Sequence, residues 1–322
     1  MSTGYRTAAR LGFRSMATDV TFHVEHPTPD AAQALEEARE VFARVESACT
    51  RFDPDSPLMR ANASPGRWHV VPQECADAVR EAGRAHLETG GVFDPRVLDA
   101  LLRLGYDRTL PFARGAVELA GAAGDAAAAR PRWRPRTERR GDRHRVHLDG
   151  TPIDLGGIGK GLAVRWAWER LRAAGDSVMV DAGGDCMFSG PGPDGDGWHV
   201  GVEDPLEGDP PVAVLVLADA GCATSSIRVR RWKVDGRRVH HLIDPRTGES
   251  GGEGLLAVTV THPDTAWAEV WSKTLFLAGP AEIAEVAAIR DLAAVWVEAD
   301  GTLRLSAAAR PLVLWTAADG YL

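Results

Sequence analysis

The segment from Asp154 to Gly161 reads DLGGIGKG and restricts the possible structures of this chain more than any other segment. It follows a strand-like stretch and opens an amphipathic stretch of helical spacing. Clustered glycines let backbone N–H groups approach a ligand closely, and a helix N-terminus beside Lys160 favours a phosphate group. The spacing matches neither the P-loop nor the GxGxxG fingerprint. The segment therefore predicts either a phosphate-binding loop or a tight strand-to-helix turn.

The composition is that of an ordinary globular protein. Of 322 residues, 44% are hydrophobic and 25% are charged, which argues against disorder and against a collagen-like structure. The net charge of −8 argues against a polyphosphate backbone as partner, so we expect no nucleic acid. We expect one elaborated unit over residues 1–322.

The chain shows no apolar run long enough to cross a membrane, so we expect a cytoplasmic protein without membrane contact. Its cysteines, Cys49, Cys75, Cys186 and Cys222, are scattered without CxxC spacing or flanking histidine pairs. This pattern predicts reduced, mostly buried thiols and argues against a zinc site or a disulfide framework.

Strand and helix patterns mix along the chain without a regular βαβ rhythm, which predicts an α+β fold with mixed or antiparallel sheets and flanking helices. Apolar alternation predicts strands, and apolar spacing of three and four predicts helices. The expected strands are 17–24, 146–148, 177–180, 198–202, 212–217 and 255–261, and the expected helices are 30–49, 73–89, 161–174 and 266–277.

Residues 113–145 change sharply in composition, first to alanine and then to arginine and proline. We expect a variable segment here, with an exposed helix followed by a solvated loop. Contact of the basic run with an anionic partner is the alternative interpretation.

Polar residues gather in four further short motifs. The segment from Asp181 to Asp185 follows an apolar strand and suits either a loop facing the same ligand or a hairpin turn. The segment from His241 to Gly248 combines a histidine, an acid and a proline turn. Phe93-Asp94-Pro95 places an acid at a turn, and Cys222-Ala-Thr-Ser-Ser226 adds hydroxyl groups.

Taken in order, these motifs resemble the FAD:protein FMN transferase family, also called ApbE-like flavin transferases. The resemblance covers nearly the whole chain. Its motifs are Met16-Ala-Thr18, Ser56-Pro-Leu-Met-Arg-Ala-Asn62, Phe93-Asp94-Pro95, IDLGGIGKGLAV, DAGGD, Trp198-His-Val-Gly-Val-Glu-Asp-Pro205, ATSS and HHLIDPRTG.

The resemblance implies an α+β fold with a deep FAD cleft, and a reaction in which a serine or threonine hydroxyl of an acceptor protein attacks the FMN phosphorus and AMP leaves. It implies that His241 is the base and that the turn at Asp244 holds it. The cofactor-binding residues it implies are Met16, Phe52, Phe93, Asp94, Asp154, Lys160, Asp185, Thr224 and Leu242.

The resemblance also implies a Mg²⁺ ion that helps to split the FAD pyrophosphate. The sequence departs from the family at the residues that would ligate this ion. The family positions that ligate the metal correspond here to Gly157, Glu269, Ser272 and Lys273, and a protonated lysine does not ligate a metal. Either Glu269 and Lys273 form an exposed ion pair, or the Lys273 ammonium occupies the position of the cation and FAD binds without Mg²⁺. Further departures are Ala17, Arg96, Arg165 and Ile227.

Three functions follow from these departures. The first is transfer of FMN from FAD to an acceptor protein. The second is an FAD-binding homologue with an altered or lost Mg²⁺ site, repurposed as a flavoenzyme or flavin carrier for a small molecule. The third is an interaction protein whose cleft no longer binds flavin.

Overall fold

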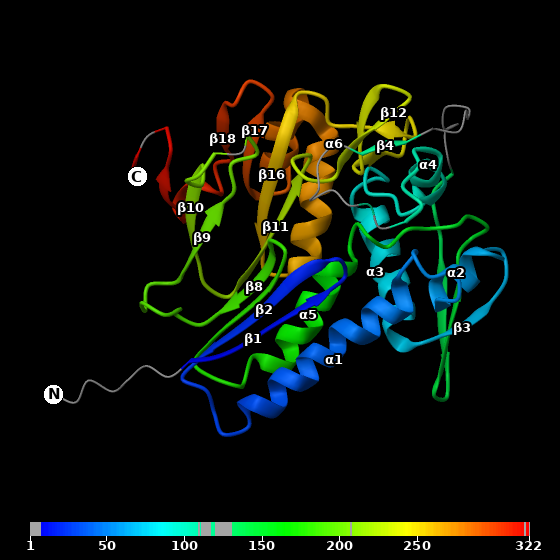
Figure 1. Ribbon diagram of the computed structural model, residues 1–322, viewed down its shortest axis with the longest axis horizontal. Coiled ribbons are helices and arrows are strands. Elements are labelled where there is room, and N and C mark those ends of the chain that lie inside the picture. The colour runs from blue at the N-terminus through cyan, green and yellow to red at the C-terminus, as the bar shows by residue number, and fades with distance from the viewer. Residues whose placement is uncertain are drawn as a thin grey trace.

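An eight-stranded antiparallel sheet forms the centre of the protein, with the strand order β1-β2-β7-β8-β11-β16-β17-β18 (Figure 1). The computed structural model describes residues 8–108, 110, 117–119, 131–206, 208–318 and 320–321. The strands of this sheet are β1 (Ala8–Ser15), β2 (Thr18–Glu25), β7 (Ser177–Ala182), β8 (Asp185–Ser189), β11 (Ala220–Ser226), β16 (Leu255–His262), β17 (Ala293–Glu298) and β18 (Leu303–Leu305).

Two helices pack together beneath β1 and β2: α1 (Ala31–Cys49) and α5 (Gly159–Leu171) (Figure 1). Helix α1 buries Leu35, Ala38, Phe42 and Val45, whose spacing of three and four residues places them on one face. That face shares one apolar cluster with β2, β7 and α5. This packing fixes helix α5, whose first residues form the end of the glycine-rich segment.

A long helix, α6 (Thr265–Ile289), packs on β11 and β16 (Figure 1). The Asp264 side chain caps its start by accepting the N–H of Ala266. The helix breaks at Gly279, whose φ of 74° is left-handed, just before Pro280. The part before the break carries Glu269, Ser272 and Lys273.

Smaller sheets and helices complete the fold around the central sheet, with β20-β19-β10-β9, β13-β12-β4, β14-β15 and β3-β6-β5 as the strand orders. These strands are β3 (His69–Val71), β4 (Glu118–Leu119), β5 (Arg136–Arg140), β6 (Arg143–His147), β9 (Trp198–Val202), β10 (Ala213–Leu217), β12 (Arg231–Val234), β13 (Arg237–His240), β14 (Ile243–Asp244), β15 (Glu249–Ser250), β19 (Val313–Thr316) and β20 (Gly320–Tyr321). The remaining helices are α2 (Pro57–Asn62), α3 (Gln73–Glu88), α4 (Leu98–Arg103) and the 3₁₀ helix η2 (Arg310–Leu312).

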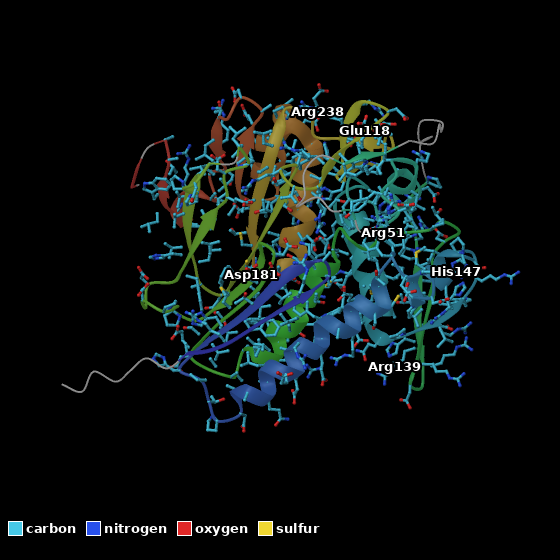
Figure 2. All side chains as sticks on the ribbon, viewed as in Figure 1. Arg51, Glu118, Arg139, His147, Asp181 and Arg238 are labelled. Carbon is cyan, nitrogen blue, oxygen red and sulfur yellow. The ribbon has the colours of Figure 1, made fainter. Side chains whose placement is uncertain are left out.

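The predicted α+β class and each of the predicted strands and helices outside 113–145 are confirmed in position. The loop expected before residue 145 is wrong, because 136–147 form the β5–β6 hairpin beside α3. Figure 2 shows its Arg139 and His147 far from Asp181. The helix expected earlier in that segment falls largely at 113–116 and 120–130, outside the described residues.

Strand β1 is an addition to the sequence prediction, although exposed and half-buried residues alternate along it. The four cysteines are free and buried, as expected, and burial raises the pKa of Cys222 to about 12. Among the helices that the structure describes, none is long and apolar enough to cross a bilayer.

Candidate active site

Two adjoining cavities, of about 280 Å³ and about 1050 Å³, form one cleft between α1, α5, α6 and the β11–β14 region. The smaller cavity has a largely apolar and aromatic wall that includes Met16, Phe93, Leu242 and Leu277. The larger one is more polar and includes Asp181, Thr224 and Glu269. The residues that line both are Ala17, Phe52, Tyr106, Gly156, Lys160, Arg230, His241 and Lys273.

The β1–β2 turn supplies Met16 and Ala17 to the cleft. Ser15 pairs with Thr18, so Met16 and Ala17 are the two loop residues, and their φ values of 51° and 59° are both left-handed. A two-residue turn of this kind is type I′, which favours glycine or asparagine. The backbone therefore explains why glycine suits position 17, and Ala17 adopts the same conformation with strain.

Arg51 anchors the aromatic wall. Its Nε donates to Asp154 Oδ2 at 2.7 Å, and both side chains are less than a tenth exposed. Its guanidinium lies 4.2 Å from the ring centre of Phe52 and 4.3 Å from that of Tyr106. Asp154 thus orders Arg51 and the two rings, in addition to capping the N–H of Gly156.

The glycine-rich segment both lines the cleft and makes a close contact between helices. Gly156 and Gly157 line the cleft. Gly161 instead allows α5 to cross α6 closely, since a Cβ atom there would lie 2.7 Å from the Ala266 Cα. The N–H of Gly161 donates to Glu269 Oε2 at 2.8 Å, so this N–H already has a partner within the protein.

Two lysine–carboxylate pairs, each with a buried carboxylate, contribute their lysines to the cleft wall. Lys160 Nζ donates to Asp185 Oδ2, and Lys273 Nζ donates to Glu269 Oε1 at 3.1 Å. Burial would raise the pKa of Glu269, but the charges of Lys273 and Lys160 and the Gly161 N–H outweigh it and lower that pKa. Burial raises the pKa of Asp185 against the opposing charge of Lys160. Burial would lower the pKa of Lys160, but Asp185 and Glu269 outweigh it and raise that pKa.

These contacts do not fit a magnesium ion at the predicted position. Both oxygens of Glu269 already accept hydrogen bonds. Ser272 is fully buried, with its hydroxyl bonded to Ser225 Oγ at 2.8 Å and donating to the Glu269 carbonyl. A Cβ atom on Gly157 would lie 3.4 Å from Lys273 Cδ, so the lysine stem fills the space between Gly157 and Glu269. In the described ranges, no cluster of three histidine, cysteine or acidic side chains suits a metal.

His241 stands where the two cavities meet, and its ring is neutral. Its Nδ1 lies 3.3 Å from the carbonyl oxygen of Arg230. Because a carbonyl only accepts, Nδ1 carries the proton and Nε2 keeps its lone pair. Burial, followed by the charges of Arg230 and Lys273, holds the pKa of His241 well below its usual value of 6.5.

Asp244, predicted beside His241, does not reach the cleft with its carboxylate. Arg246 binds both of its oxygens, with Nε donating to Oδ1 at 2.9 Å and Nη2 donating to Oδ2 at 2.8 Å. The Asp244 carbonyl also accepts the N–H of Gly248. Asp244 therefore builds the β14–β15 turn that follows His241.

The remaining predicted residues divide between the cavity wall and its support. Met16, Phe52, Phe93, Asp94, Asp154, Lys160 and Leu242 line the smaller cavity, whereas Thr224 lines the larger one and its hydroxyl is bonded to Thr259. Asp94 is held by Arg96, whose Nη2 donates to its Oδ2 at 2.7 Å. Asp185 is buried behind Lys160 and is not a wall residue. Arg165 pairs with Asp264 at 2.7 Å, outside both cavities.

The sequence analysis missed Arg51, Tyr106 and Arg230. Composition does single out the cleft lysines, because lysine is rare in this chain. Of its 37 basic residues only Lys160, Lys233 and Lys273 are lysines, and Lys160 and Lys273 line the cleft. Arg51 and Arg230 lie among many arginines, so composition does not single them out. Figure 2 labels Arg51, which lines the smaller cavity, and Asp181, which lines the larger one.

A family model described as the ApbE family matches residues 16–296, a span that contains every cleft residue named above. The chain belongs to the ApbE family. It is 30% identical over 277 residues to the FAD:protein FMN transferase of Treponema pallidum, a match covering 81% of this chain and 75% of that protein. It is 30% identical over 151 residues to the FAD:protein FMN transferase of Escherichia coli strain K12, covering 46% of this chain and 43% of that protein.

The fold agrees with a solved structure of the ApbE family. The ApbE protein of Thermotoga maritima superposes with a TM-score of 0.77 over 95% of this chain and 99% of that one, at 24% identity. The predicted family fold is therefore confirmed.

Proposed function

We propose that this protein binds FAD and transfers FMN to a serine or threonine hydroxyl of an acceptor protein, with release of AMP. The observation that carries the proposal is the continuous cleft in which an aromatic wall meets Gly156, Gly157 and two half-buried lysines. An isoalloxazine ring suits the aromatic wall, and a pyrophosphate suits the polar end. The curated relatives named FAD:protein FMN transferase give the same reaction class. The chain acts as one unit in this proposal.

In this reaction the acceptor oxygen forms a bond to the FMN phosphorus, and the bond from that phosphorus to the AMP oxygen breaks. The acceptor hydroxyl proton passes to Nε2 of His241. A neutral histidine whose Nδ1–H is held by the Arg230 carbonyl suits this role. The protein's part is to align the two reactants and to stabilise charge on the phosphates.

Lys273 supplies positive charge in place of a metal ion in this proposal. Its stem lies against Gly157, and its ammonium is fixed by Glu269. Lys160, on the first turn of α5, provides a second ammonium on the wall of both cavities. FAD binding therefore does not require Mg²⁺. The repurposed flavoenzyme of the sequence analysis is not favoured, because the curated relatives are named as transferases.

The test is incubation with FAD and an acceptor protein that an ApbE-family enzyme already flavinylates, followed by chromatography of nucleotides and mass analysis of the acceptor. We expect AMP and flavin-bearing acceptor in equal amounts, and loss of both with His241→Ala. The matched control is His240→Leu, since His240 packs on Phe276 and lies outside both cavities. FAD that binds and stays intact would contradict the transferase and favour a flavin carrier. Absence of FAD binding would favour the interaction protein.

A further inference from the structure

Six cationic side chains line the cleft, and five of them already have a carboxylate partner within the protein. Among the residues that the structure describes, Arg230 has no such partner. The five pairs are Arg14 with Asp19, Arg51 with Asp154, Lys160 with Asp185, Arg228 with Glu203, and Lys273 with Glu269.

The position of Arg230 is as distinctive as its charge. It is half-buried and lines both cavities, at the boundary between the aromatic and the polar end. Its carbonyl oxygen accepts from His241, and its charge helps to lower the pKa of His241 and opposes the rise in the pKa of Lys160. Arg230 thus lines the same two cavities as the proposed base, His241, and the Lys160 ammonium.

A half-buried guanidinium without a counter-charge is suited to an anionic ligand. Its planar fork of N–H groups matches two phosphate oxygens at once, whereas an ammonium acts as a point charge. The ammonium groups of Lys160 and Lys273 are each partly neutralised by a buried carboxylate. Among the six cationic side chains of the cleft, Arg230 is therefore the one whose charge no described carboxylate neutralises through an ion pair.

We propose that Arg230 binds the pyrophosphate of the dinucleotide and holds the phosphate that is transferred beside His241. This inference rests on the proposed function, since it takes FAD as the ligand. It adds a phosphate-binding residue that acts from the β11–β12 connection, in the same two cavities that Gly156 lines.

The test compares the affinities of FAD and riboflavin for the wild-type protein, Arg230→Gln and Arg230→Lys by fluorescence titration. Riboflavin has the same ring system and no phosphate. We expect Arg230→Gln to weaken FAD binding roughly 10- to 100-fold, in line with loss of a hydrogen bond to a charged group, and to leave riboflavin binding unchanged. Arg230→Lys keeps the positive charge and loses the planar fork of N–H groups. Its FAD affinity should lie between those of the wild-type protein and Arg230→Gln.

The matched control is Arg228→Gln, two residues earlier on the wall of the larger cavity, where the arginine is paired with Glu203. It should change FAD affinity much less. Removal of Arg230 orphans no described carboxylate, so Arg230→Gln should keep the wild-type unfolding midpoint. Unchanged FAD affinity in a folded Arg230→Gln protein, or equal weakening of FAD and riboflavin, would overturn the inference and leave the proposed function standing. Failure of the wild-type protein to bind FAD would overturn both.

Discussion

Lys273 Nζ donates to Glu269 Oε1 at 3.1 Å across one turn of α6, while Oε2 of the same carboxylate accepts the N–H of Gly161 on α5. One buried carboxylate thus joins a cleft cation to the helix that follows the glycine-rich segment. The side chain of Glu269 is 1% exposed and that of Lys273 is 17% exposed, which excludes the exposed ion pair considered from the sequence.

Removing the Lys273 ammonium should destabilise the protein. Lys273→Met leaves the buried Glu269 charge without its nearest counter-ion, and breaking a buried pair in this way costs about 3 kcal/mol. Urea unfolding at pH 7 measures the change. Lys233→Met is the control, because Lys233 is exposed on β12 and should change stability by less than about 0.5 kcal/mol. Equal effects of the two substitutions would contradict a stabilising role for the buried pair.

The two buried carboxylates should affect acid stability in opposite directions. The folded-state pKa of Glu269 is lowered, so its stabilisation is present above its unfolded pKa of about 4.3 and is lost as the pH falls through the folded value. The folded-state pKa of Asp185 is raised, so the folded protein takes up this proton first and the contribution of Asp185 falls as the pH rises.

Glu269→Gln should therefore flatten the loss of stability between about pH 5 and pH 3, and Asp185→Asn should steepen it. Unfolding free energies of the three proteins across this range provide the measurement. If both substitutions changed the slope of unfolding free energy against pH in the same direction, the pKa values of Glu269 and Asp185 would not be shifted in opposite directions, and the prediction would be wrong.

Relief of the left-handed strain at position 17 should stabilise the protein. Ala17→Gly removes the Cβ from a residue with φ of 59°, and we expect a gain of about 1 kcal/mol at this position. The same substitution at Ala9, in the extended part of β1, should instead destabilise by roughly 0.5–1 kcal/mol. Thermal unfolding of both variants measures the difference, and a loss of stability in Ala17→Gly would argue against a strained turn.

The two neighbouring histidines should respond differently to loss of Arg230. Burial alone lowers the pKa of His240 to about 4, whereas the charge of Arg230 adds to burial at His241. In Arg230→Gln the pKa of His241 should rise toward its usual value while that of His240 stays the same. Histidine NMR titrations report both groups in one sample. Parallel shifts would mean that the substitution opened the structure instead of removing a charge.

Magnesium should have little influence on the wild-type protein, because Lys273 fills the space beside Gly157 and Glu269. Calorimetric titration of FAD should give the same affinity with Mg²⁺ and with a chelator. Glu269→Asp combined with Lys273→Thr removes the ammonium and should make FAD cleavage depend on Mg²⁺. A folded double variant that stays inactive with Mg²⁺ would count against this exchange of a metal for a lysine.

The sequence by itself determined the positions of six strands and four helices and the motifs of the cleft. Apolar spacing located α1, α3 and α6, since burial of one face is a local requirement on each helix. Glycine spacing located the DLGGIGKG segment but left its role open, because a tight turn and a ligand loop need the same residue. The motifs, which are spread over nearly the whole chain, identified the family by resemblance.

Only the tertiary structure decided which charges remain free for a ligand. Asp94, Asp154, Asp185 and Asp244 share the carboxylate chemistry expected of a site, yet each is held by a basic side chain. Arg51, adjacent to Phe52, is paired in the same way. Two of these pairs, Arg51 with Asp154 and Lys160 with Asp185, join residues far apart in sequence, and no local pattern records such contacts. The other two join residues only two positions apart. Arg230 differs from the other arginines only by what the fold places around it.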